Sequence, residues 1–342
     1  MKSILYFIAF ISVVSLYAKD CDACDRTIKG RYVTAGNKTY CNRTCFNKTL
    51  PKCKYCKKTL TGKFYRENDG SALCQRCHKK KMPTCMHCSK KVTAWVTTAG
   101  NILCKPCSKK TRCDECHLPS KKMRTLRDGR HVCGTCEKVA IYDLQRAIIV
   151  YKRARKELKA MTGYQTAKSP RLVMCYRDEL MKKLNSTRKL DTTHGMVRGY
   201  YHYAERIEQT SIAGKVIKEK KEIKKSIYVL RGMTKQHLIL TCIHEHMHDV
   251  IRMKFTRLED VPLWVNEGIC QYISAILARD YSMKKELVEI ETQADPVYGD
   301  GYRYFRKRLG ANNWKGLVKW MKTIKLSAIP KSAPKVSLKK KK

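Results

Sequence analysis

The sequence is short of acidic side chains. It has 29 Asp and Glu against 73 Lys and Arg in 342 residues, which gives a formal net charge of +44. The chain stays strongly basic even if its paired cysteines bind zinc as thiolates. This charge favours an anionic partner, such as an anionic membrane or wall surface, an acidic protein or a nucleic acid. A generally Lys-rich proteome would give the same composition and is the alternative.

The sequence also lacks a second long hydrophobic run. Its first residues, MKSILYFIAFISVVSLYA, have a positive start at Lys2, an apolar stretch and a small residue, Ala18, before a cleavage point. This is the pattern of a secretory signal, and it is short for a membrane span. Residues 1–18 are therefore predicted to be the signal peptide of a secreted or periplasmic protein, with an uncleaved N-terminal anchor as the alternative. No later run is long enough to predict a further span.

Cysteine, in contrast, is abundant, with 19 residues. Sixteen of them form eight close pairs, separated alternately by long and short gaps, which is a fourfold repeat of about 30 residues. The pairs are Cys21/Cys24, Cys41/Cys45, Cys53/Cys56, Cys74/Cys77, Cys85/Cys88, Cys104/Cys107, Cys113/Cys116 and Cys133/Cys136. The stretch between the two pairs of each repeat is polar with a Gly near its end, as in RYVTAGNKTYC, which is typical of a β-hairpin.

Two such pairs supply the four thiolates of a tetrahedral zinc site. Residues 21–136 are therefore predicted to be four tandem zinc fingers, each with four cysteine ligands and one structural zinc ion. Disulfides are the alternative, because a secreted, cysteine-rich chain normally forms them. The Cys-x-x-Cys spacing favours metal, because it suits a metal-binding turn better than a structural crosslink. Each repeat is too short to bury a core alone, so metal binding would supply its folding energy. Nearby histidines are not needed as ligands, because every repeat already has four cysteines.

After the fingers, the hydrophobic pattern becomes that of an α+β domain. Residues 139–162 have the period of a linker helix, and residues 171–176 and 225–231 read as strands. Further helices are expected from the N-cap Thr234 to about Phe255 and over residues 263–279, 282–292, 300–309 and 312–323. Residues 170–325 are predicted to form one domain, and residues 326–342 a disordered basic tail.

The stretch HEHMHD, which begins at His244, has three histidines and two carboxylates in six residues and could form a metal site. Positions i and i+4 share a helix face, so His244 and His248 can bind one ion. Glu245 lies beside them, close enough to take a proton from a bound water, which is the HExxH pattern of zinc peptidases. His246 falls on a different face and is not expected to be a ligand. A histidine-rich, solvent-exposed helix face is the alternative.

A third protein ligand is required, and Glu267 follows His248 after eighteen residues, in PLWVNEGICQYIS. HExxH-x18-E together with P-x-W-x-x-E-G-x-x-x-Y resembles the gluzincin superfamily, including its aminopeptidases. The resemblance implies a zincin-like fold in which His244, His248 and Glu267 hold one catalytic zinc. Zinc lowers the pKa of its water and polarises the scissile carbonyl. Glu245 then takes the water's proton and passes it to the leaving amine.

The order of fingers, strand and peptidase helix is similar to that of one family in particular. It resembles the plant LIM-domain-containing, ubiquitin-activated metallopeptidases that restrict organ size, most strongly at IYVLRGM, HEHMH, NEGICQ and YGDG. This resemblance implies hydrolysis of a protein or peptide substrate, with LIM-like fingers that recruit a partner or substrate. Two features depart from LIM domains: the third finger ligand is Cys instead of His, and the linkers are longer. Ubiquitin-interacting motifs are missing, so ubiquitin activation does not carry over.

Further roles follow from the same resemblance. In gluzincin aminopeptidases a downstream Tyr often shares the charge of the oxyanion. Tyr298 in YGDG is the first candidate here, Tyr302 the second and His194 the third. The alternative is that Tyr298 only caps and packs the turn. The strand around 226–230 is expected to offer an edge to an extended peptide. One helical turn after Glu267, Gln271 could orient a ligand histidine, and a role in packing explains it equally well.

Two other classes of function compete with a peptidase. The first is a non-enzymatic zinc-finger binding protein that uses the peptidase fold as a scaffold, although an intact HExxH-x18-E set argues against it. The second is nucleic-acid binding, which is not favoured because the basic residues are scattered around the cysteine pairs. The remaining cysteines, Cys175, Cys242 and Cys270, are expected to be buried thiols.

Overall fold

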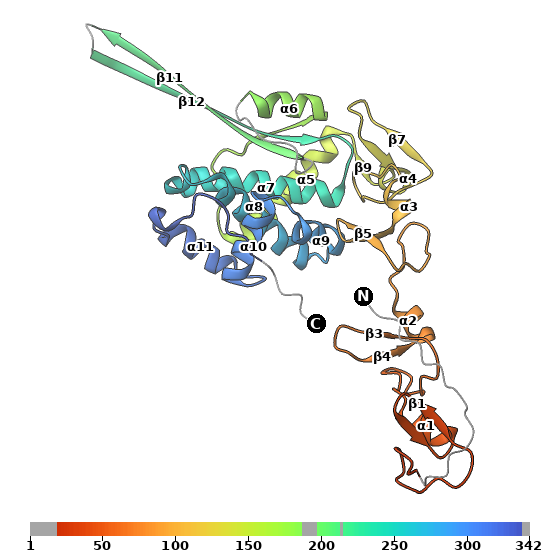
Figure 1. Cartoon of the computed structure of the whole chain (residues 1–342). Coiled ribbons are helices and arrows are strands. Elements are labelled where there is room, and N and C mark those ends of the chain that lie inside the picture. The colour runs from red at the N-terminus through yellow and green to blue at the C-terminus, as the bar shows by residue number, and fades with distance from the viewer. Residues whose placement is uncertain (1–18, 187–196, 213–214, 337–342) are drawn as a thin grey trace. The chain divides into compact units, whose positions relative to one another are not determined.

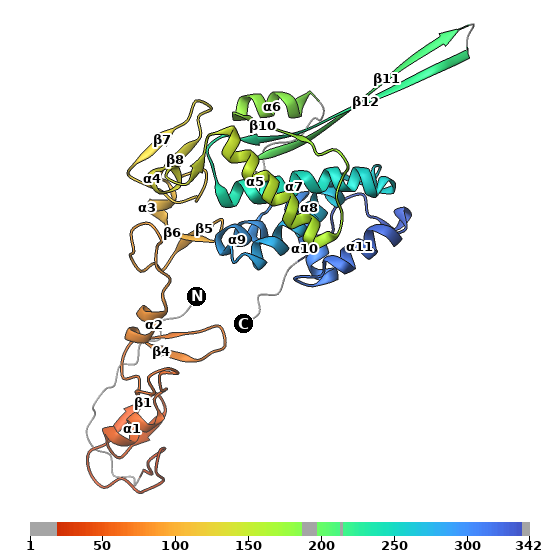
Figure 2. The ribbon, with the colours of Figure 1, turned by 180° about the vertical axis from the view of Figure 1, so that it is seen from behind.

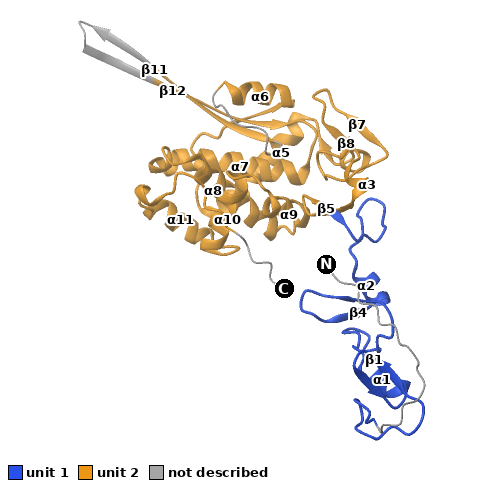
Figure 3. Cartoon of the chain, in the orientation of Figure 1, with its two compact units in different colours: residues 1–95 blue, residues 96–342 orange. Residues whose placement is uncertain are grey.

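The computed structural model describes residues 19–186, 197–212 and 215–336, and Figures 1 and 2 show it from opposite sides. The predicted signal segment, residues 1–18, lies outside these ranges and stays a prediction. Within the described ranges, none of the helices has the length and apolar character needed to cross a membrane. The chain divides into two compact units, Met1–Trp95 and Val96–Lys342 (Figure 3).

The first unit is built from small antiparallel hairpins, each followed by a short helix. Its elements are β1 (Val33–Ala35), β2 (Lys38–Tyr40), α1 (Arg43–Thr49), β3 (Phe64–Arg66), β4 (Ala72–Cys74) and α2 (Gln75–Lys81). The same hairpin and helix recur later in the chain as β5 (Trp95–Thr98), β6 (Asn101–Cys104), α3 (Lys105–Ser108), β7 (Met123–Thr125), β8 (His131–Cys133) and α4 (Gly134–Glu137). The hairpins predicted between the cysteine pairs are therefore confirmed.

Each repeat also opens on the same tight Cys-x-x-Cys turn, called the knuckle below. The residue after the knuckle donates its backbone N–H to the carbonyl of the first cysteine, as Lys57 does to Cys53 at 2.9 Å. That residue has a left-handed backbone in all four repeats, which is uncommon outside glycine. The residues and their φ angles are Asp25 (57°), Lys57 (58°), Ser89 (58°) and His117 (58°). The fourfold repeat of the sequence is thus a repeat of backbone geometry.

The rest of the second unit is a mixed α+β domain, as predicted. Its elements are β9 (Ala140–Ile141), α5 (Leu144–Thr162), β10 (Arg171–Cys175), α6 (Arg177–Asn185), β11 (Gly199–Ile212), β12 (Lys215–Leu230), β13 (Met233–Thr234), α7 (Lys235–Lys254), η2 (Thr256–Leu258), α8 (Leu263–Asp280), α9 (Lys284–Thr292), α10 (Tyr298–Leu309), α11 (Trp314–Thr323) and η3 (Leu326–Ala328). The five helices expected from Thr234 onward are confirmed as α7 to α11. Helix α6 was not predicted, because its nine residues carry too short an apolar pattern.

A three-stranded sheet lies against these helices, in the order β10-β12-β11. Strand β10 runs parallel to β12, and β11 runs antiparallel to it. Figures 1 and 2 show α6 over one face of the sheet, α5 and α7 over the other, and α8 and α10 behind α7. Beyond the sheet, β11 and β12 continue as a long two-stranded ribbon.

The expectation that residues 226–230 offer an edge to a peptide is wrong. Strand β12 is central: Ile227, for example, pairs with Leu172 on one side and with Tyr201 on the other. Its backbone groups are therefore already used in the ladders. In the part of the chain that the structure describes, the edge strand on that side of the sheet is β11, next to α7.

The main core surrounds α7 and α8, whose inward side chains are almost completely buried. Helix α5 belongs to this core as well as linking it to the fingers, since Ala147, Ala154 and Leu158 are buried against α7. The start of the predicted tail also contacts the domain: Trp264 donates its indole N–H to the Pro330 carbonyl at 3.0 Å. Ordered structure thus continues past residue 325, and residues 337–342 lie outside the described ranges.

Candidate metal centres

Helix α7 begins at the predicted N-cap and is buried on nearly all sides. The Thr234 hydroxyl accepts a hydrogen bond from the His237 N–H at 3.4 Å, which satisfies one donor of the first turn. The apolar run that follows packs into the core. His244, Glu245 and His246 are only 9%, 7% and 2% exposed, so the solvent-exposed histidine face is excluded. Titratable groups at this depth need partners or a metal ion.

Three of the predicted ligand side chains converge between α7 and α8. Glu267 Oε2 lies 2.9 Å from His244 Nε2 and 3.3 Å from His248 Nε2. Both histidines thus present the nitrogen far from the backbone, and the carboxylate from the second helix reaches both. Burial alone would raise the pKa of Glu267, but the facing imidazoles, His248 first, lower it well below its ordinary value. Two imidazoles and one carboxylate form a donor set that fits zinc.

A fourth group at this centre is the Cys270 thiol. The ligand atoms of His244, His248 and Cys270 lie within 4.8 Å of one another, so they could hold a metal ion. Cys270 is fully buried, and burial raises its pKa well above the ordinary value of a thiol. The sequence had indicated only a buried thiol. The available signal was its spacing, because Cys270 follows Glu267 by three residues on α8 and so shares its face.

Glu245, the predicted base, is held under the first residue of β11. A Cβ added to Gly199 would lie 2.9 Å from Glu245 Cγ and 2.5 Å from Thr241 Cγ2. Only glycine allows this close approach of backbone to side chain. The edge strand β11 therefore begins directly over Glu245. Gly199 is a residue of the site that was not predicted from the sequence.

The first oxyanion candidate, Tyr298, stands beside the histidines. Its ring centroid lies 6.0 Å from that of His244. Tyr298 begins α10, and its N–H donates to Asp295 Oδ1 at 2.8 Å. Helices α8 and α10 cross with almost no side chain between them, because a Cβ on Gly268 would lie 2.7 Å from the Gly301 carbonyl carbon. This crossing brings the start of α10 close to the ligands on α8.

The other two oxyanion candidates, Tyr302 and His194, are not seen beside the histidines. The Tyr302 hydroxyl lies 2.5 Å from Arg279 Nη2 and 3.2 Å from Glu291 Oε1, and its side chain is completely buried. Its hydrogen-bonding capacity is therefore engaged away from the histidines. His194 lies outside the described residues.

Neighbouring polar groups fix the helix around the histidines. Asp249 is fully buried and accepts from Thr166 Oγ1 at 2.6 Å, Tyr201 OH at 2.9 Å and Lys225 Nζ at 2.9 Å. Since Asp249 follows His248, this cluster ties the ligand-bearing turn to the base of β11 and β12. His246 is not a member of the metal group: its Nδ1 lies 3.2 Å from Tyr151 OH.

Gln271, which was expected to orient a ligand histidine, points elsewhere. Its side-chain N–H donates to Gln293 Oε1 at 2.9 Å. Gln293 is the residue that ends α9, so Gln271 serves the packing of α8 on α9.

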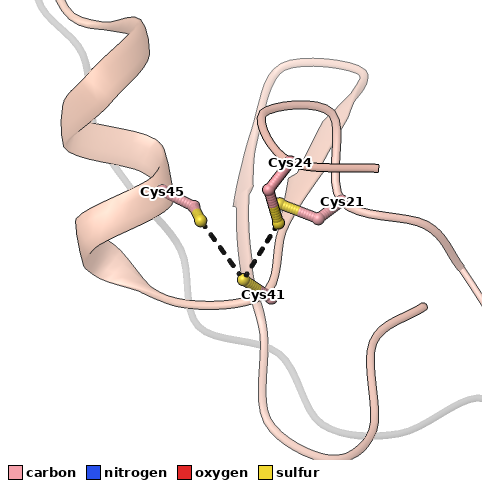
Figure 4. A group of neighbouring side chains, drawn as sticks. All are labelled: Cys21, Cys24, Cys41 and Cys45. Carbon is pink, nitrogen blue, oxygen red and sulfur yellow. Dashed lines mark hydrogen bonds between the residues drawn. The ribbon is translucent and has the colours of Figure 1, made fainter. Parts of the chain in front are cut away.

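The sixteen paired cysteines form four quartets, each made of the two pairs of one repeat. In every quartet the four sulfur atoms lie within 4.8 Å of one another. Figure 4 shows the first quartet, with Cys21 and Cys24 on the knuckle, Cys41 after β2 and Cys45 on α1. Here Cys41 Sγ lies 3.8 Å from Cys24 Sγ and 3.3 Å from Cys45 Sγ. A disulfide would need about 2.0 Å, so these three sulfur atoms are too far apart for a disulfide and are spaced as ligands of one ion would be.

Backbone N–H groups point at the first sulfur atom of a quartet and favour its thiolate, while neighbouring thiols raise the pKa of others, such as Cys77, to about 12. Cys53 Sγ accepts from the Cys74 N–H at 3.4 Å, and such bonds from Cys56 and Cys74 lower the pKa of Cys53 to about 6. In the fourth quartet, Cys113 Sγ accepts from the Cys133 N–H at 3.3 Å. Thiolates are the form that binds zinc. The four thiol quartets and the histidine centre therefore suggest metal binding, with donor sets suited to zinc.

No protein-family model and no curated protein matches the sequence.

Proposed function

We propose that this chain is a zinc-dependent metallopeptidase with a gluzincin-type, zincin-like catalytic domain. The observation that carries the proposal is the approach of His244 and His248 to Glu267, with Glu245 buried in the same turn of α7. A surface cluster of histidines would have no reason to draw a carboxylate from a second buried helix. The resemblance to plant LIM-containing metallopeptidases points in the same direction and is part of the proposal.

The catalytic roles follow from the donor set and its neighbours. Zinc held by His244, His248 and Glu267 would supply Lewis-acid chemistry, polarising a carbonyl and activating water. Glu245 accepts the proton of the attacking water on its carboxylate and passes it to the leaving amine. The Tyr298 hydroxyl donates to the oxygen that becomes negative during attack. The Asp249 cluster keeps the ligand-bearing turn in place.

The substrate class is an extended segment of a protein or peptide. Among the described residues, β11 is the edge strand of the sheet next to α7, and its first residue packs on Glu245. An extended peptide that adds to this edge makes main-chain hydrogen bonds and runs past the proposed base. Side-chain specificity would come from groups around the edge, so a single recognition sequence is not proposed.

The quartets are proposed to hold four structural zinc ions in LIM-like fingers, which gives five zinc ions with the catalytic one. These fingers have only cysteine ligands and no proposed catalytic residue, so their proposed role is to recruit a protein partner or the substrate. The strong positive charge suits an anionic surface as a further partner. Secretion through residues 1–18 is proposed on the sequence pattern alone, and zinc would then protect the thiols from oxidation.

A non-enzymatic binding protein is the second candidate, and Cys270 is the observation that favours it. Structural zinc sites are closed by four protein ligands, whereas catalytic sites keep one position open. If Cys270 binds the metal together with the histidines and Glu267, no position remains for water. The peptidase proposal therefore requires that the Cys270 thiol stay off the metal.

Replacement of Glu245 separates these candidates. We expect Glu245→Gln to keep five zinc ions and its melting temperature but to lose peptide hydrolysis on the order of a hundredfold or more, because it removes a base and not a ligand. The matched control is Glu259→Gln, an exposed carboxylate just after α7. Cleavage of a peptide library and elemental analysis provide the two readouts. Wild-type cleavage by Glu245→Gln would refute the catalytic assignment.

A further inference from the structure

The fourth knuckle differs from the other three in the residue before its second cysteine. Glu115 in this position is 2% exposed, whereas Tyr55, its equivalent in the second knuckle, is 46% exposed. The third knuckle has His87 there and the first has Ala23. A buried carboxylate requires partners, and a knuckle of only four residues cannot supply them itself.

The partners of Glu115 lie on the helix that carries the HExxH pattern. Glu115 Oε2 accepts from the Thr234 N–H at 2.8 Å and lies 2.8 Å from His237 Nδ1. These are the N-cap and first turn of α7. The other ring nitrogen of His237 lies 3.1 Å from Glu289 Oε2 on α9. With a carboxylate at each nitrogen, the protonated ring donates to both and joins the knuckle, α7 and α9.

The same network continues to the strand above the proposed base. Arg198 Nη1 donates to Glu289 Oε1 at 2.6 Å, and Arg198 Nη2 lies 3.4 Å from the Asp114 carbonyl in the knuckle. Arg198 directly precedes Gly199, which packs on Glu245. The knuckle therefore contacts both elements that position Glu245, which are α7 and the start of β11.

The hairpin of the fourth finger is buried against the loop that leads into α7. Arg130, in the turn between β7 and β8, is 1% exposed and donates to the Arg231 carbonyl at 2.6 Å. Its Nε lies 2.9 Å from Asp128 Oδ2, which also accepts from the Arg177 N–H at 2.8 Å. A Cβ on Gly232 would lie 3.2 Å from Leu126 Cδ1, so the hairpin packs directly on the loop.

From these contacts we infer that the metal site of Cys113, Cys116, Cys133 and Cys136 is an internal structural element of the α+β domain, and that it positions α7 and β11 at the histidine centre. Without metal the four thiolates have nothing to hold them together, so the knuckle opens and withdraws Glu115. His237 then loses one of its two carboxylate partners and Arg198 loses its bond to the Asp114 carbonyl. Loss of one partner from a buried ion pair is strongly destabilising. The second quartet belongs to the other compact unit, and in its knuckle Lys54 pairs with Glu67 and Asp69 of the same finger.

Loss of single quartets tests the inference in the full-length chain. Cys133→Ser with Cys136→Ser is compared with the matched double variant Cys74→Ser with Cys77→Ser. Three of the four tryptophans, Trp264, Trp314 and Trp320, lie on α8 and α11, so tryptophan fluorescence mainly reports melting of the α+β domain. Trp95 lies on β5 in the third finger, and Trp95→Phe in both variants removes its signal. We expect the fourth-quartet variant to melt on the order of 10 °C lower and to lose metal from the histidine centre too. The second-quartet variant should lose one zinc without a change in this melting temperature. Equal melting temperatures in the two variants would overturn the inference.

A milder variant covers the case in which the fourth-quartet variant does not fold. Glu115→Gln leaves every thiol in place, and Glu137→Gln is its control, since Glu137 pairs with the exposed Arg124 of the same finger. We expect Glu115→Gln to keep the zinc of its quartet while the domain melts several degrees lower than in the control. The same melting temperature in both would refute the connection. Neither readout uses hydrolysis, so the result is independent of the proposed activity.

Discussion

The thiol quartets and the histidine centre are built in opposite ways. The ligands of a quartet come from one short segment, and each small apolar cluster around them holds only a few residues, such as Cys53, Leu60, Ala72 and Leu73. The ligands of the histidine centre come from two long helices inside the main core of the chain. We therefore expect a quartet to need metal in order to fold. The histidine centre is held in shape by the core, and in the proposed function its metal serves catalysis.

The two kinds of site also differ in the number of protein ligands that each offers to a metal ion. Four sulfur atoms close a site, while two histidines and a carboxylate leave a position for water. The fourth quartet links the two kinds of site, since its ligands are local and its knuckle is embedded in the domain. Changes to the metals and their neighbours can test each half of this comparison.

Removal of all metal should have the largest effect. Structural zinc contributes about 10–16 kcal/mol to the folding of isolated fingers, so a strong chelator under reducing conditions should unfold the first two fingers completely. Amide hydrogen exchange should then show loss of protection at knuckle amides such as Lys57, while amides in the middle of α8, such as Ile273, stay protected. Equal loss of protection in α8 would mean that the core depends on metal as much as the fingers do.

Loss of Glu267 should separate the two kinds of site within one molecule. Glu267→Ala removes a ligand from the histidine centre, so we expect four zinc ions to remain, the fifth to be lost and hydrolysis to fall below detection. Cys270→Ala is the control on the same face of α8 and should retain five zinc ions with activity. The opposite result, with metal lost only in Cys270→Ala, would make the thiol the third ligand and would favour the non-enzymatic candidate.

Sequence reasoning located the features that depend on local spacing. The knuckles, the hairpins between them and α7 with its N-cap Thr234 all follow from residues a few positions apart. The ligand histidines were found for the same reason, since an i, i+4 pair fixes its own geometry once a helix forms. Glu267 came from the resemblance to gluzincins, because nothing local connects it to His248.

Features set by packing between distant segments could not be predicted. The edge of the sheet was misplaced because the parallel pairing of β10 with β12 joins segments about fifty residues apart, and no periodicity encodes strand order. The embedding of the fourth knuckle was missed because Glu115 gains its partners from Thr234 and His237, far along the chain. An acidic residue inside a Cys-x-x-Cys turn ordinarily faces solvent.

Removal of the Tyr298 hydroxyl should cost less than loss of a ligand. Tyr298→Phe takes away the donor proposed for the oxyanion, and loss of one such donor typically lowers kcat by about a hundredfold to a thousandfold. The ring and its packing on His244 remain, so zinc content, melting temperature and KM should change little. Steady-state kinetics on a cleaved library peptide measure the effect. An unchanged kcat would remove Tyr298 from the mechanism.

Tyr302→Phe should have the smallest effect. We expect it to lower stability slightly and to leave catalysis unchanged. The Tyr302 hydroxyl bonds to Arg279 and Glu291, and burial raises its pKa to about 12. Without it, Arg279 still pairs with Glu291 at 2.8 Å and donates to the Ala311 carbonyl at 2.8 Å, so no buried charge is left unpaired. We expect a loss of about 1 kcal/mol in the free energy of unfolding, or about 2–4 °C in Tm, with kcat unchanged. A collapse of kcat in Tyr302→Phe, with normal turnover in Tyr298→Phe, would transfer the oxyanion role to Tyr302 and would require α10 to rearrange when substrate binds.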